Sequence, residues 1–178
     1  MKKLITFIVF LVLFGGCNEL MNSPTKKVEE FFNRYQTLDD SLLNNLDYSI
    51  ESNNLNEEEK NMYRNIMKRQ YKDLTYKIKD EEIDGDLATV KVEIEVYDYS
   101  LASINASEYF KNNQDFFLNE EGEVDTFKYT DYKLDLMKDI NERVKYTLDI
   151  TVRKKDKTWM MDNISRDDLL KIHGVYSY

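Results

Sequence analysis

Cysteine, proline, glycine and histidine are all scarce in this chain of 178 residues. It has one cysteine, one proline, five glycines and one histidine. A single cysteine excludes an intramolecular disulfide, and so little proline and glycine argues against long disordered linkers. Hydrophobic residues make up 42% of the chain, which is enough for one domain with a substantial core.

Positive charge is also in deficit, since 25 Lys and Arg residues face 34 Asp and Glu residues. The formal net charge of -9 repels nucleic acid phosphates and the headgroups of anionic lipids. We therefore expect that the domain binds no nucleic acid, and that an anionic lipid surface is not one of its partners.

Catalytic and metal-binding motifs are missing as well. Residues 80–91 come nearest to a calcium loop, but the twelfth position, which must supply a bidentate carboxylate, is Lys91. A solvated type I′ turn at Asp84-Gly85 is the better interpretation. His173, beside a predicted helix end at Gly174, is interpreted as a cation at a helix C-terminus. We expect no catalytic residue, no metal and no cofactor.

The N-terminus carries an export pattern. Lys2 and Lys3 precede an apolar segment, residues 4–14, which is interrupted only by Thr6. This segment is too short for a stable transmembrane helix, but it is typical of a secretory signal. Two glycines and then Cys17 follow it.

The stretch LVLFGGC, residues 11–17, resembles the lipobox of bacterial lipoproteins, although Phe14 stands where that motif usually has Leu. The resemblance implies cleavage between Gly16 and Cys17 and attachment of diacylglycerol to the cysteine sulfur. It divides the chain into a signal peptide (1–16), a lipidated N-terminus with a short stalk (17–22) and a single α+β domain (23–178). The protein would then be held at the extracytoplasmic face of the cell membrane. The alternatives are an ordinary secreted protein with a leftover thiol and a cytosolic protein with an apolar N-terminus.

Hydrophobic spacing predicts helices first. Ser23-Pro24 is a helix start, and apolar residues recur at three- and four-residue spacing over about residues 24–38, 42–50 and 62–71. A short final helix begins after Ser165. Clusters of acidic residues at 39–40, 57–59 and 167–168 favour helix N-termini, so we interpret them as structural.

Strict alternation of apolar and polar residues predicts strands over about 74–78, 90–96 and 144–152, with a last strand at 158–161. Ile83 falls out of phase with Ile78, which indicates a bulge near residues 80–82. Between the two hairpins, residues 100–142 form an insertion with helical spacing in its second half.

Helices followed by an antiparallel sheet, with the opening SPTKKVEEFFNRY and the closing hairpin KKDKTWMMDNI, resemble the cystatin-like fold of the nuclear transport factor two-like superfamily. The resemblance implies N-terminal helices packed on a curved antiparallel sheet, here with a helical insertion between the two hairpins. In that superfamily the concave face leaves a conical pocket, which holds ligands, makes dimer contacts or is filled by side chains.

Thirteen tyrosines stand against one tryptophan. The residues that could line such a pocket are Tyr76, Tyr97, Tyr129, Tyr132, Tyr146 and Trp159. With Asp98 or Asp149 they could serve an isomerase-like enzyme. We prefer the interpretation that they are core and interface residues.

The sequence therefore favours a noncatalytic, lipid-anchored module that binds a protein, a peptide or a small ligand at the bacterial cell surface. The alternatives are a small-pocket enzyme that uses a tyrosine and an aspartate, and a structural component of the envelope.

Overall fold

The computed structural model describes residues 22–177, so the predicted signal peptide, Gly16, Cys17 and the stalk up to residue 21 lie outside the described residues. The element order is α2 (Pro24–Gln36), α3 (Asp40–Glu51), α4 (Glu57–Asp73), β1 (Thr75–Asp84), β2 (Leu87–Tyr97), α5 (Ser100–Asn112), the 3-10 helix η1 (Gln114–Phe117), α6 (Thr126–Asp139), β3 (Arg143–Lys155), β4 (Thr158–Met161) and α7 (Arg166–Ile172). The predicted α+β class, with helices preceding an antiparallel sheet, is confirmed.

Polar side chains begin the helices where the sequence indicated. Ser23 accepts a hydrogen bond from the amide of Lys26 at the start of α2, and Asp39 caps α3 in the same way. A capping box that was not predicted starts α4, where Asn56 and Glu59 satisfy each other's amides. These side chains satisfy amides of the first helical turn, which have no hydrogen-bond partner within the helix.

The four strands form one antiparallel sheet in the order β1-β2-β3-β4. The register of β1 against β2 shifts between Ile78 and Asp80, which places the predicted bulge about one residue earlier than expected. Every second residue of β2 is buried, as the alternation predicted. Strand β2 lies inside the sheet, and β1 forms one edge.

The turn between β1 and β2 differs from the prediction. Asp84 pairs with Leu87 as the last residue of β1, so Gly85 and Asp86 form the two-residue loop. Only Gly85 has a positive φ, of 60°, which fits a type II′ turn, with glycine first, and not a type I′ turn at Asp84-Gly85. The second hairpin has positive φ at both Asp156 and Lys157, as a type I′ turn requires.

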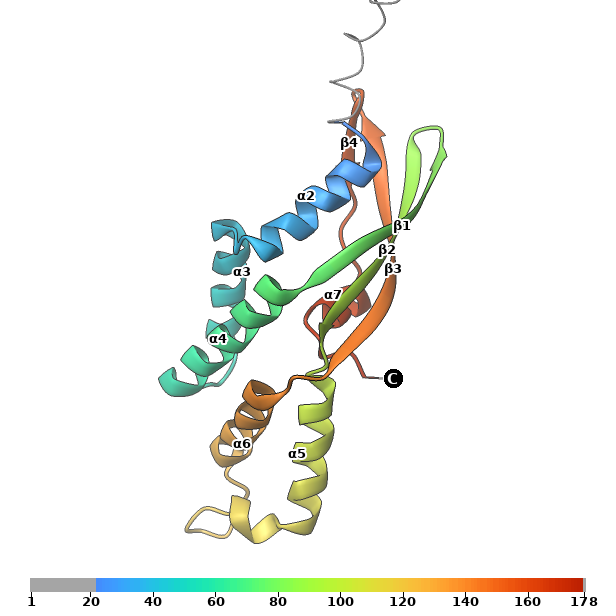
Figure 1. Ribbon diagram of the computed structural model, residues 1–178. Helices are drawn as coiled ribbons and strands as arrows, with labels where there is room; N and C mark the ends of the chain where they lie inside the picture. Colours follow the sequence, from blue (N-terminus) through green and yellow to red (C-terminus); the bar gives the residue numbers. More distant parts are fainter. Residues whose placement is uncertain (1–21, 178) are drawn as a thin grey trace, which may run out of the picture.

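The main core lies between α2 and the sheet. Helix α2 contacts all four strands and crosses the face of the sheet (Figure 1). Side chains of α2, α3 and α4 pack there against β2 and β3. Its members without exposed surface are Val28, Phe32, Ile50, Met67, Val90, Val92, Ile94, Val96, Val152 and Ile172.

The insertion has a smaller core of its own, which rests on α4. Figure 1 shows α5 and α6 side by side, directed away from the end of the molecule at which the described chain begins. Their contact with α4 is made by Ile66, Tyr99, Ala102, Leu134, Met137 and Ile140. The insertion is therefore a separate lobe that is attached to the helices.

A buried glutamine connects three elements. Gln70 of α4 is fully buried, accepts a hydrogen bond from the amide of Tyr97 at 3.0 Å, and donates to the carbonyls of Tyr97 and Ile172, both at 3.3 Å. Gly174 follows α7 with a φ of 71°, and its carbonyl accepts the amide of Ser100. The end of α7 is thus tied to α4, to β2 and to the start of the insertion.

The prediction that His173 is a helix-end cation is wrong. Its Nε2 lies 3.2 Å from Oη of Tyr71, because the end of α7 lies beside α4, where Gln70 also donates to the carbonyl of Ile172. Burial lowers the pKa of His173 to about 4. The imidazole is therefore neutral at physiological pH.

We expect the free energy of unfolding to decrease as the pH falls from 6.5 toward about 4. In this window the unfolded chain protonates His173 and the folded chain does not, so protons favour unfolding. The decrease should reach about 3 kcal/mol and end near the folded pKa, since both states are protonated below it. Urea unfolding at a series of pH values measures this decrease.

The matched variant is His173→Gln, which removes the titrating group and leaves the carboxylates. The difference between the two pH profiles therefore reports His173 alone. Parallel profiles would contradict a neutral, desolvated imidazole.

Candidate functional site

The far end of the insertion contains a cluster of six aromatic rings. Phe117 of η1 is fully buried, and its ring centroid lies between 5.0 and 6.0 Å from those of its five neighbours. These neighbours come from α5, η1 and α6 and are Tyr109, Phe110, Phe116, Tyr129 and Tyr132. The side chains of the tip are thus organised around one phenyl ring.

Part of this cluster is open to solvent. Phe116 is 57% exposed and Tyr109 is 37% exposed. The ring of Tyr109 stacks on that of Tyr132 at 4.8 Å and meets that of Phe116 edge-on at 6.1 Å. We call Tyr109, Phe116 and Tyr132 the tip patch. Exposed contiguous aromatic surface of this kind is typical of protein interaction sites.

The segment that joins α5 to α6 at the tip is acidic. The segment 114–125 contains five carboxylates and no lysine or arginine. One of them, Asp125, is used to cap α6. The others are exposed: Asp115 lies in η1, and Glu120, Glu121 and Glu123 lie in the loop that follows it. The tip therefore combines apolar surface with negative charge.

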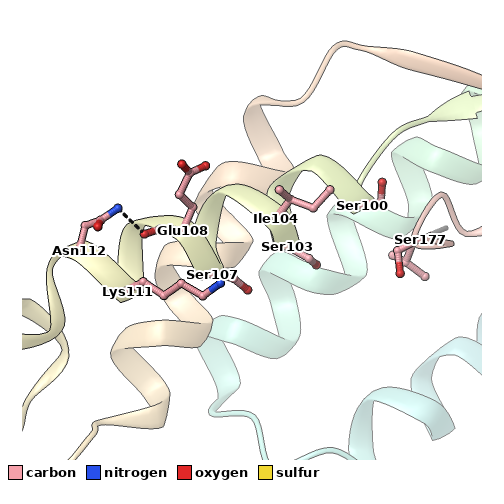
Figure 2. Close-up of a pocket in the computed structure, with 9 residues that line it drawn as sticks. Ser100, Ser103, Ile104, Ser107, Glu108, Lys111, Asn112 and Ser177 are labelled. Atoms are coloured by element: carbon pink, nitrogen blue, oxygen red, sulfur yellow. Dashed lines mark hydrogen bonds between the residues drawn. The ribbon is translucent and has the colours of Figure 1, made fainter.

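A second feature of the insertion is an open groove of about 700 Å³ along α5. Figure 2 shows Ser100, Ser103 and Ser107 along the helix, with Ser177 of the C-terminal segment beside them. The charged side chains on the groove are Glu108 and Lys111. None of the six predicted pocket residues lines it.

Tyr97, one of those six, lies between the sheet and the insertion. The guanidinium carbons of Arg69 and Arg143 are 4.0 and 4.8 Å from the centroid of its ring, and its hydroxyl donates to Asp73 at 2.9 Å. Arg69 also donates to Asn141 and to the carbonyl of Lys138. This arrangement joins α4 to the end of α6, which is a structural role.

The other predicted pocket residues do not share one cavity with Tyr97. Tyr76 stacks on Phe32 at 4.9 Å, whereas Tyr146 and Trp159 are buried in the main core. Tyr129 and Tyr132 both belong to the aromatic cluster of the tip. The structure therefore brings together the last two and separates them from the rest.

The two aspartates considered for catalysis are also apart. Asp98 accepts a hydrogen bond from Ser100, and Asp149 is an exposed residue of β3, opposite Lys91. Within residues 22–177 no three His, Cys, Asp or Glu side chains form a group that could hold a metal ion. No helix in that range is both long and apolar enough to cross a membrane.

Comparisons with known proteins give little further information. No family model and no curated protein matches the chain. A solved structure that does match is a protein of Bacillus subtilis subsp. subtilis str. 168, described as a "putative lipoprotein (ycdA)", at 16% sequence identity and a TM-score of 0.40. The match covers 67% of this chain and spans 38% of the length of that protein. The resemblance to cystatin-like proteins stays a prediction.

Proposed function

We propose that this protein is a lipid-anchored extracytoplasmic module that binds another protein through the tip patch. The partner that fits has a basic and partly apolar surface. The observation that carries the proposal is the exposed aromatic surface of Tyr109 and Phe116, held in place from below by buried Phe117.

Charge and position support this choice of partner. The exposed carboxylates of the tip, which are Asp115, Glu120, Glu121 and Glu123, disfavour a second copy of the same tip, because like charges would meet. The tip also lies at the far end of the molecule from the start of α2, near which the described chain begins (Figure 1). Anchoring through Cys17 would therefore direct the tip away from the membrane.

The anchoring itself rests on the charged start, the apolar run and the small residues before Cys17. Two acyl chains on this residue give stable attachment, whereas a single chain gives only marginal attachment. Asn22 is five residues beyond Cys17, so the domain would stay close to the bilayer.

Site-specific photocrosslinking in cells tests the binding surface. A benzoylphenylalanine at position 116 should form a crosslinked species with a second protein, whereas the same group at Tyr48 should form none. Tyr48 is the matched control because it is an aromatic residue with 80% exposure on α3, outside the insertion.

Replacing Glu120, Glu121 and Glu123 by glutamine should reduce the crosslink at position 116 severalfold, because three exposed charge pairs are lost. Equal crosslinking at positions 116 and 48 would contradict the proposal. So would a crosslinking yield at position 116 that is the same with and without the three glutamine substitutions.

A further inference from the structure

The opposite end of the molecule carries the densest group of basic residues that the described chain contains. The end of β3 and the turn that follows it have the sequence Arg-Lys-Lys-Asp-Lys at positions 153–157, and we call this stretch the lysine turn. All five side chains are exposed. This turn is positively charged although the chain as a whole is acidic. The net charge of the chain therefore does not reveal it.

Most of this charge is unpaired within the domain. Arg153 forms an ion pair with Asp162 at 2.7 Å. Among residues 22–177, Lys154, Lys155 and Lys157 have no carboxylate close enough for an ion pair. The ammonium of Lys154 lies instead 5.5 Å from the centre of the Trp159 ring. Three ammonium groups are therefore available to an external anion.

The same turn holds the first described residue. The side chain of Asn22 donates to the carbonyl of Lys157 at 2.8 Å and accepts from the amide of Trp159 at 3.0 Å. The five residue-to-residue steps from Cys17 to Asn22 can span at most about 18 Å. If Cys17 carries the lipid, the lysine turn cannot lie far from the headgroups.

We propose that Lys154, Lys155 and Lys157 bind anionic lipid headgroups and so fix the orientation of the anchored domain. This inference rests on the lipid anchor of the proposed function. Asp84 and Asp86 on the neighbouring β1–β2 turn carry carboxylates, which repel anionic headgroups. The contact is therefore confined to the side of the β3–β4 turn. Each lysine near an anionic surface should raise the docked population about fivefold.

Trp159, the only tryptophan, is a native reporter of this contact. The full chain, processed and purified from a bacterial host, is reconstituted in vesicles that contain a fluorescent headgroup acceptor. Energy transfer from Trp159 should be higher in vesicles with phosphatidylglycerol than in phosphatidylcholine alone. The difference should disappear in 1 M salt, where the Debye length is about 3 Å.

Three triple variants test whether these lysines cause the difference in energy transfer between the two kinds of vesicle. K154Q/K155Q/K157Q should lose the extra energy transfer on phosphatidylglycerol, because the docked population falls on the order of a hundredfold, and K154R/K155R/K157R should retain it. K72Q/K133Q/K138Q removes the same charge from α4 and α6 and should behave like the unmodified protein.

Equal energy transfer on both kinds of vesicle, or the same loss in K72Q/K133Q/K138Q, would overturn the inference while leaving the anchor intact. Flotation with phosphatidylcholine vesicles tests the anchor separately, with Cys17→Ser as the control that cannot be acylated. A chain that floats no better than Cys17→Ser would contradict the lipid anchor and, with it, the docking of the turn.

Discussion

Gly174→Ala should destabilise the domain by more than about 3 kcal/mol, because two independent costs add. The residue has a φ of 71°, a conformation that costs a side chain about 1–2 kcal/mol. A methyl group there would lie 2.0 Å from the carbonyl oxygen of Tyr97 and 2.4 Å from Nε2 of Gln70. These atoms belong to the buried hydrogen bonds that join α4, β2 and α7.

Gly85→Ala is the matched control for this prediction. Gly85 has a φ of 60° and no heavy atom within 4 Å of the added methyl group, so only the backbone cost of about 1–2 kcal/mol applies. Urea denaturation of both variants measures the difference. Equal losses of stability would show that the close approach at Gly174 is not tight.

Phe117→Ala should cost about 3–5 kcal/mol, as deletion of a fully buried phenyl ring usually does. The side chain has no exposed surface, and the rings of five neighbours from α5, η1 and α6 surround it. Because the insertion has its own small core, we expect α5 and α6 to open before the sheet. Hydrogen exchange should show faster exchange of their amides than of the amides of β2 and β3.

Phe116→Ala removes the same atoms from the adjacent position, where the ring is 57% exposed. Its cost should stay below about 1 kcal/mol, and the exchange pattern should not change. Crosslinking from position 109 then distinguishes two effects. Phe116→Ala removes part of the exposed binding surface, whereas Phe117→Ala removes the buried ring that holds this surface in place. Similar losses of stability in both variants would contradict the packing described for the tip.

The local elements were predictable because their signals are local. Alternation along β2 and β3, helical spacing from Val28 to Tyr71, and the caps at Ser23, Asp39 and Ser165 each depend on neighbours within a few residues. Even the bulge in β1 followed from the phase of Ile78 and Ile83. The error at Gly85 arose because Asp84-Gly85 and Gly85-Asp86 are both acceptable two-residue turns, and the register of the sheet selects between them.

The candidate site was less predictable, since it depends on contacts between distant segments. Tyr129 and Tyr132 were singled out as pocket residues together with Tyr76 and Tyr146, although the structure places the first pair in the tip and the second pair in the main core. The aromatic residues of 109–117 gave no regular period, because η1 turns the chain between α5 and α6. No spacing rule indicates that Phe117 is buried while Phe116 is exposed.

By itself, the sequence determined the class of the fold and the approximate positions of most helices and strands, because hydrophobic period and capping depend on residues that are close in the chain. The export signal and the lipobox resemblance stay predictions. Only the tertiary structure decided that His173 is neutral, that Gly174 must lack a side chain, and that the tip patch and the lysine turn lie at opposite ends of the molecule. Those properties depend on which surfaces become buried against each other. This is decided only when segments that are distant in the sequence pack together.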